Sequence, residues 1–146
     1  MIRNGKLKID NFNENNLTPN GYDVTVDECY IPSLNKKSED IPGSTFFIVS
    51  TKEYFYFPND IIGQIWIRTS WARKGIVLSS GIIDAGFEGK LNLFAHTTNM
   101  DVKISKGDRI AQIIFIKLDR EAEKPYSIRS GHYHKQDGIW LNEKVK

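Results

Sequence analysis

One short stretch of the chain combines two arginines with two hydroxyl groups. Arg68, Thr69, Ser70 and Arg73 follow an alternating apolar run and open what could be a short helix. Hydroxyl and backbone N–H groups at a helix start bind anions, and arginine adds charge-assisted hydrogen bonds to phosphate oxygens. The same residue types also suit a Ser/Thr helix cap with exposed arginines. Spacing alone leaves both interpretations open.

A second stretch places an aspartate among glycines. Three glycines flank an aspartate, a phenylalanine and a glutamate in the range 80–89, between two strand patterns. A glycine-bearing hairpin lets the backbone approach a planar ligand closely. Asp84 lies between Ile83 and Ala85, which predicts a partly desolvated carboxylate that could work as a base. The alternative is an ordinary hairpin with a hydrogen-bonded aspartate.

Two more polar residues interrupt strand patterns. Asp23 follows Gly21 and Tyr22 and leads into a strand, where it is either a solvated turn residue or part of a site. Gln112 lies within an apolar run after a Lys-Gly-Asp turn. A buried glutamine must find hydrogen-bond partners, so Gln112 predicts either a structural contact or a phosphate contact.

The elements that must position these residues are mostly strands. Short runs rich in β-branched, aromatic or alternating apolar residues occupy 24–26, 45–51, 54–57, 63–67, 90–95 and 110–118, separated by Pro- and Gly-bearing turns. Only 71–74 and 119–124 could form helices, and each is too short to pack a helical core. In 90–95, Leu91, Leu93 and Ala95 share one face and Phe94 lies on the other. The pattern predicts one all-β domain over 1–146, a barrel or jelly-roll-like fold.

Composition excludes several classes of protein. The chain has 146 residues and a net charge of +2, without the basic excess of a bulk nucleic-acid binder. No apolar run approaches the roughly 20 residues of a membrane-spanning helix, and the N-terminus lacks a signal-peptide core. The single cysteine, Cys29, cannot form an internal disulfide, which favours a cytoplasmic setting.

Taken in order, these motifs resemble those of the dUTPase and dCTP deaminase superfamily. The series Gly-Tyr-Asp, Arg-Thr-Ser, Gly-Ile-Ile-Asp-Ala-Gly-Phe-Glu-Gly and Gly-Asp-Arg-Ile-Ala-Gln-Ile-Ile runs from about Asn20 to Gly138. The resemblance implies a distorted jelly-roll-like β-barrel of the β-clip type with one short helix at most. It also implies a homotrimer with shared active sites and a C-terminal tail, 125–146, that caps the site.

The resemblance also distinguishes between two reactions. Deaminases of this superfamily carry a glutamate five residues after the last glycine of the third motif, where this chain has Phe94. A phenyl ring cannot transfer a proton, and His96 is a poor substitute because it is out of register. The sequence therefore predicts a dUTP diphosphatase that releases dUMP and pyrophosphate. A dCTP deaminase, a bifunctional enzyme and a non-catalytic nucleotide-sensing trimer are the alternatives.

The resemblance assigns roles to individual residues. Asp84 would orient and activate water, and Asp23 would hold a Mg²⁺ ion through water. The triphosphate would be bound by Arg68, Thr69, Ser70, Arg73, Gln112 and Arg129. The nucleoside would be bound by Ser80, Ile83, Phe87, Tyr133 and Gln136.

Overall fold

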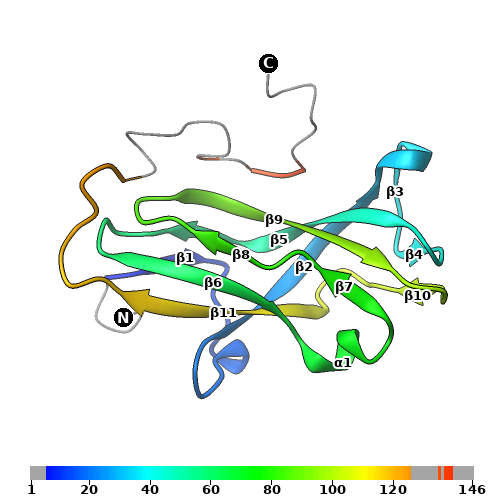
Figure 1. Ribbon diagram of the computed structural model, residues 1–146, viewed down its shortest axis with the longest axis horizontal. Coiled ribbons are helices and arrows are strands. Elements are labelled where there is room, and N and C mark those ends of the chain that lie inside the picture. Colours follow the sequence, from blue (N-terminus) through cyan, green and yellow to red (C-terminus); the bar gives the residue numbers. More distant parts are fainter. Residues whose placement is uncertain (1–5, 126–134, 136, 140–146) are drawn as a thin grey trace.

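A curled antiparallel sheet forms most of the molecule. The computed structural model describes residues 6–125, 135 and 137–139. Within these residues the sheet has nine strands: β1 (Lys8–Asp10), β2 (Tyr22–Ile31), β3 (Lys36–Lys37), β5 (Phe46–Tyr56), β6 (Ile61–Ile67), β7 (Ile76–Leu78), β8 (Gly81–Ile83), β9 (Glu88–Thr97) and β11 (Arg109–Lys117). Their main order is β7-β9-β5-β2-β11-β6-β8, with β1 on β5 and β3 on β2. The sheet curls into a half-barrel (Figure 1).

The remaining elements are small. A separate two-stranded sheet joins β4 (Asp40–Ile41) to β10 (Val102–Lys103). The helix α1 (Thr69–Ala72) has four residues, and two 3₁₀ turns, η1 (Glu14–Asn16) and η2 (Pro32–Leu34), flank β2. The predicted all-β, jelly-roll-like class with one short helix is confirmed. Among the described residues, the helices lack the length and the apolar character of a membrane span.

The predicted strands recur with shifted boundaries. The runs 45–51 and 54–57 merge into the single strand β5, whose pairing with β9 is irregular between Ser50 and Tyr54. The second possible helix, 119–124, does not form. Its Ala122 N–H donates to the carbonyl of Asn59 at 2.8 Å, so the loop at 59–60 replaces the intrahelical partner.

The largest fully buried side chains of the core are aromatic. Tyr22, Phe47 and Phe55 are fully buried in one apolar cluster. Along β9 buried residues alternate with more exposed ones, so Phe94 and His96 point outward together as the sequence predicts. This alternation fixes which side chains of β9 can reach a ligand.

The strands β8 and β9 are not paired with each other in the described residues. β7 pairs with β9, and the last contact is a hydrogen bond from the Ser79 N–H to the carbonyl of Phe94 at 2.8 Å. The chain then crosses to β6, where Gly81 lies opposite Ile65 and Ile83 opposite Gly63. The described strand pairs do not join β8 to β9 (Figure 1). The inner edge of β8 therefore keeps backbone groups available for a ligand.

Candidate functional site

An aspartate and two arginines meet at the junction of β2, β11 and β6. Asp23 is 5% exposed, and its Oδ2 lies 3.1 Å from Arg68 Nε and 3.8 Å from Arg109 Nη1. Arg68 is half-buried, whereas Arg109 keeps 45% of its side chain exposed. Of the two alternatives for Asp23, the solvated turn residue is excluded, because the carboxylate is buried and ion-paired.

Burial and the two arginines act on Asp23 in opposite directions. Burial disfavours the ionised carboxyl, and the positive charges of Arg68 and Arg109 favour it. The net effect raises the pKa of Asp23 above its usual value, so burial outweighs the attraction. The charged carboxylate is therefore kept at a cost in stability, which is typical of a group that holds a site in place.

Strand register brings this cluster together. Gln112 of β11 lies opposite Asp23 of β2 on one side and opposite Trp66 of β6 on the other. Gly21 makes room for the close approach of β2 and β11, because a Cβ at this position would collide with the backbone oxygen of Ile113. The Gly-Tyr-Asp motif thus has a steric reason for its glycine.

The helix start beside Arg68 is held by backbone contacts. The carbonyl of Arg109 accepts hydrogen bonds from Trp71 Nε1 at 2.7 Å and from Arg68 Nη1 at 3.2 Å. Arg68 itself is the N-cap and makes no side-chain cap bond, so the alternative of a Ser/Thr cap is excluded. Thr69, Ser70 and Arg73 are exposed around this turn. Their hydroxyl and guanidinium groups are therefore open to a ligand.

Gln112 has a structural partner. Its Nε2 donates to Thr18 Oγ1, and the side chain is half-buried. This contact ties β11 to the loop before β2, in line with the structural interpretation of the sequence. A phosphate contact would use the amide oxygen and stays a prediction.

The aspartate of the glycine-bearing hairpin lies in a tight turn. The Phe87 N–H donates to the carbonyl of Asp84 at 3.1 Å, and Gly86 adopts φ +83, a conformation that favours glycine. Asp84 is exposed while Ile83 and Phe87 are 4% and 5% exposed. The predicted partial desolvation of Asp84 is therefore wrong for the single chain. The rings and methyl groups of Ile83 and Phe87 belong to the core, which leaves backbone groups and exposed Ser80 to meet a nucleoside.

The two candidate halves of the site are far apart within one chain. Ile83 pairs with Gly63 at the start of β6, whereas Arg68 follows the end of β6. Five residues of extended strand separate these positions by about 17 Å at roughly 3.3 Å per residue. Asp84 and the Asp23–Arg68 cluster therefore do not meet in the single chain.

The predicted tail residues Arg129, Tyr133 and Gln136 lie outside the described residues. Described neighbours contact the outer face of β9: the Asn92 side-chain amide donates to the carbonyl of Gly138 at 2.7 Å, and Lys90 Nζ lies 3.8 Å from Asp137 Oδ1. These contacts place this part of the tail on its own chain.

Sequence reasoning missed two residues of the cluster. Arg109 lies in the same Gly-Asp-Arg-Ile-Ala-Gln motif as Gln112, and an arginine directly after a Gly-Asp turn is a signal that the sequence does contain. Trp71 fixes the helix start through the carbonyl of Arg109. Its indole N–H needed a buried partner, but sequence alone did not identify that partner.

The described residues do not form a self-sufficient metal site. No group of three His, Cys, Asp or Glu side chains among them could hold a metal ion. Both ion pairs of Asp23 use Oδ2, which leaves Oδ1 for a water-mediated contact. The donor set fits a Mg²⁺ ion only if a ligand supplies most of the oxygens, as nucleotide phosphates do.

Comparisons with known proteins agree with the motifs. The dCTP deaminase-like family model matches residues 33–118. A probable deoxyuridine 5′-triphosphate nucleotidohydrolase of Sulfolobus islandicus rod-shaped virus 1 is 34% identical, covering 96% of this chain and 90% of its own. A dCTP deaminase of Thermococcus kodakarensis is 32% identical, covering 97% of this chain and 94% of its own.

Solved structures share the fold. The dUTPase of Staphylococcus bacteriophage 80alpha, solved with dUpNHpp, matches with a TM-score of 0.60 at 17% identity, covering 82% of this chain and 95% of its own. A dUTPase from phage phi11 of S. aureus, solved with a structural Mg(II) ion, has a TM-score of 0.60 at 18% identity. The match covers 81% of this chain and 94% of the phi11 chain. On the family model and the relatives above 30% identity, the chain belongs to the dCTP deaminase-like family, within the superfamily of dUTPases and dCTP deaminases.

Proposed function

We propose that the protein is a dUTP diphosphatase, which hydrolyses dUTP to dUMP and pyrophosphate. The observation that carries the proposal is the outer face of β9. Phe94 occupies the position at which the resemblance expects the glutamate of a deaminase, and its side chain is 37% exposed on the outer face of β9. Asp84, the carboxylate that hydrolysis requires, is kept and exposed at the hairpin turn.

In this proposal the chain's own residues divide the reaction between them. Asp84 orients a water molecule and accepts its proton while the water oxygen attacks the α-phosphorus. The bond from that phosphorus to the bridging oxygen of the β-phosphate breaks, and pyrophosphate leaves. Arg68, held by Asp23, and the exposed hydroxyls of Thr69 and Ser70 bind the phosphate oxygens.

We propose Mg²⁺ as the cofactor. When bound with the nucleotide, it would neutralise part of the triphosphate charge. Asp23 would hold it through water with Oδ1, since Oδ2 is engaged by the two arginines.

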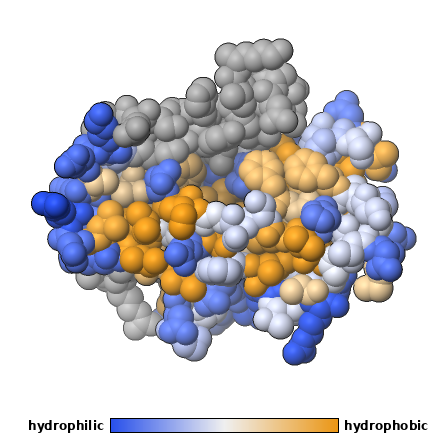
Figure 2. All heavy atoms as spheres, viewed as in Figure 1, coloured by the Kyte–Doolittle hydropathy of each residue, from blue (hydrophilic) through white to orange (hydrophobic). Residues whose placement is uncertain are grey.

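We further propose a homotrimer in which neighbouring chains complete each site. Asp84 follows Ile83, whose partner Gly63 lies about 17 Å along β6 from Arg68, and this supports shared sites since the nucleotide must contact both residues. An exposed apolar face also supports it (Figure 2). Trp66 and Ile82 are 51% and 54% exposed on β6 and β8, and Phe46 and Val77 are 50% and 49% exposed on β5 and β7. Large exposed apolar patches of this kind mark protein interfaces.

A mixing experiment tests the shared site. Asp84→Asn and Arg68→Ala should each be inactive toward dUTP, because each lacks one half of every site. Chains that are denatured and refolded together should regain part of the activity, since some mixed sites combine an intact Asp84 with an intact Arg68. Activity that stays absent in the mixture, while separately refolded wild-type protein recovers, would contradict shared sites.

A dCTP deaminase is the second candidate, because relatives at 32% identity carry that name. His96 is the observation that favours it: this titratable residue points to the same side of β9 as Phe94. Release of ammonia from dCTP, lost in His96→Asn, would establish deamination. Tight nucleotide binding without turnover would instead indicate a nucleotide-sensing protein.

A cytoplasmic setting remains our proposal, based on the lone, buried and unpaired thiol of Cys29.

A further inference from the structure

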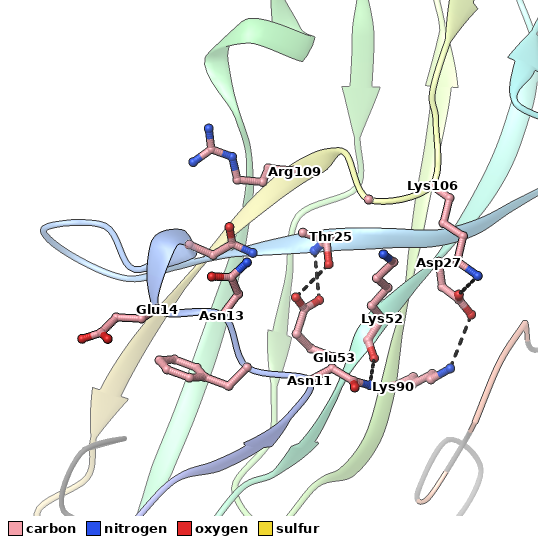
Figure 3. Close-up of a pocket in the computed structure, with 13 residues that line it drawn as sticks. Asn11, Asn13, Glu14, Thr25, Asp27, Lys52, Glu53, Lys90, Lys106 and Arg109 are labelled. Carbon is pink, nitrogen blue, oxygen red and sulfur yellow. Dashed lines mark hydrogen bonds and ion pairs between the residues drawn. The ribbon is translucent and has the colours of Figure 1, made fainter.

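A polar pocket of about 750 Å³ lies next to the Asp23 cluster. It is formed by the loop at 11–16, by β2, β5 and β9, and by the turn before β11 (Figure 3). None of the described residues predicted for the nucleotide site lines this pocket. Arg109 does line it, and Arg109 Nη1 also lies 3.8 Å from Asp23 Oδ2. The pocket is therefore a separate space that shares one wall residue with the cluster.

Three lysines line one end of this pocket, and two of them pair with a single aspartate. Lys106 Nζ lies 3.2 Å from Asp27 Oδ1, and Lys90 Nζ lies 3.4 Å from Asp27 Oδ2. Each carboxylate oxygen thus has its own lysine. Burial would raise the pKa of Asp27, but the hydrogen bonds and charges of Lys106 and Lys90 outweigh it and lower the pKa. The aspartate is fully used by these two partners.

Lys52 is the third lysine and adds positive charge without a counterion. Its Nζ lies over the turn at Gly107: if Gly107 had a Cβ, that atom would be 3.6 Å from Lys52 Nζ. Among the described residues, no carboxylate forms an ion pair with Lys52, and its side chain is half-buried. Figure 3 shows the Lys52 ammonium between Thr25 and Asp27. Lys90 also lies 3.8 Å from Asp137 Oδ1, so the three lysines face two carboxylates at this end and positive charge exceeds negative charge there.

The other buried acid does not cancel this charge. Glu53 is 1% exposed and accepts hydrogen bonds from Thr25 N at 2.9 Å, Thr25 Oγ1 at 2.8 Å and Tyr22 Oη at 3.1 Å. Burial raises the pKa of Glu53, which works against its negative charge. Glu14 lies at the opposite end of the pocket from Lys106 (Figure 3).

We propose that the lysine end of this pocket binds a di- or triphosphate group. Such a group concentrates negative charge in a small volume, and lysine ammonium groups bind phosphate as point charges. The volume lies within the range of small-molecule sites, about 300–1,000 Å³. The group could be free pyrophosphate or the phosphate chain of a nucleotide. This site goes beyond the proposed hydrolysis and does not depend on it.

Calorimetric titration of the full chain with inorganic pyrophosphate in EDTA tests the site. Lys52→Met removes the charge and keeps the length of the side chain, so the affinity should fall about tenfold, as for one lost hydrogen bond to a charged group. Lys52→Arg should keep the affinity. Lys103→Met is the matched control, because Lys103 is exposed on β10 and outside the pocket. Wild-type affinity in Lys52→Met, or no pyrophosphate binding by the wild type, would overturn the proposal.

The two sources of the phosphate group are separated by a second measurement. If Lys52→Met weakens pyrophosphate binding but leaves the KM for dUTP unchanged, the ligand is free pyrophosphate. If both change, the ligand is the phosphate chain of the nucleotide. Turnover of dUTP by the wild type, recorded in the same preparations, tests the proposed function independently, because pyrophosphate binding requires no turnover.

Discussion

The Asp23–Arg68–Arg109 cluster predicts that activity and stability respond differently to one substitution, Asp23→Asn. Asparagine keeps the shape of the side chain and removes its charge. Because burial outweighs the arginines and raises the pKa of Asp23, the ionised carboxylate does not stabilise the fold. The arginines left behind are 30% and 45% exposed and can be hydrated. The free energy of unfolding at pH 7 should therefore change by no more than about 1 kcal/mol.

The same substitution should strongly reduce catalysis. Arg68 Nε loses the carboxylate that holds it at 3.1 Å, so its hydrogen bond to phosphate is no longer preorganised. A hydrogen bond to a charged group contributes about 1.5–3 kcal/mol, which corresponds to a fall of roughly 10- to 100-fold in kcat/KM for dUTP. Pyrophosphate release and urea unfolding measure the two quantities. Asp119→Asn is the matched control, because Asp119 is exposed and follows the end of β11 opposite to Arg109.

The pH dependence follows with a definite sign. A carboxyl whose folded pKa lies above its usual 3.8 binds more protons in the folded state between those two values. Wild-type stability should therefore fall as the pH rises through this window, and Asp23→Asn should make the curve flatter. A loss of about 3 kcal/mol or more in the variant would show that the ion pair stabilises the fold. Unchanged kcat/KM would refute the role of Asp23 in positioning Arg68.

Three other substitutions have definite expected outcomes. Asp84→Asn should lower dUTP turnover about 100-fold or more and change stability by less than about 0.5 kcal/mol, since Asp84 is exposed; normal pyrophosphate release would exclude it as the base. Glu53→Ala should cost about 2–4 kcal/mol in urea unfolding, because three buried donors lose their acceptor, and a cost below about 1 kcal/mol would contradict this. Gly21→Ala should cost about 1–3 kcal/mol and reduce kcat/KM, because the new Cβ collides with β11 beside Asp23; wild-type thermal stability would contradict the close packing.

The sequence predicts the local pattern of this fold well. Alternation along 90–95 correctly separates the buried leucines from outward Phe94, because side chains of a strand alternate between its faces. Short strands such as β7 and β8 were missed, since three residues carry too little periodicity. Their pairing with β9 and β6 depends on contacts far apart in the chain.

The candidate site was predictable as a set of residues but not as a geometry. The motif order selects Asp23, Arg68 and Asp84, yet nothing local shows that Arg68 pairs with Asp23 or that Asp84 lies at the other end of β6. Burial is likewise a tertiary property: the sequence leaves open whether Asp23 is solvated, and it is buried, whereas Asp84 was expected to be partly desolvated and is exposed.

The most direct test of the proposed function is incubation of the purified protein with dUTP or dCTP in Mg²⁺, with pyrophosphate and ammonia measured separately. The proposal predicts pyrophosphate from dUTP and no ammonia from dCTP, because Phe94 cannot transfer a proton at the pyrimidine ring. Ammonia from dCTP, or no pyrophosphate from dUTP, would contradict it.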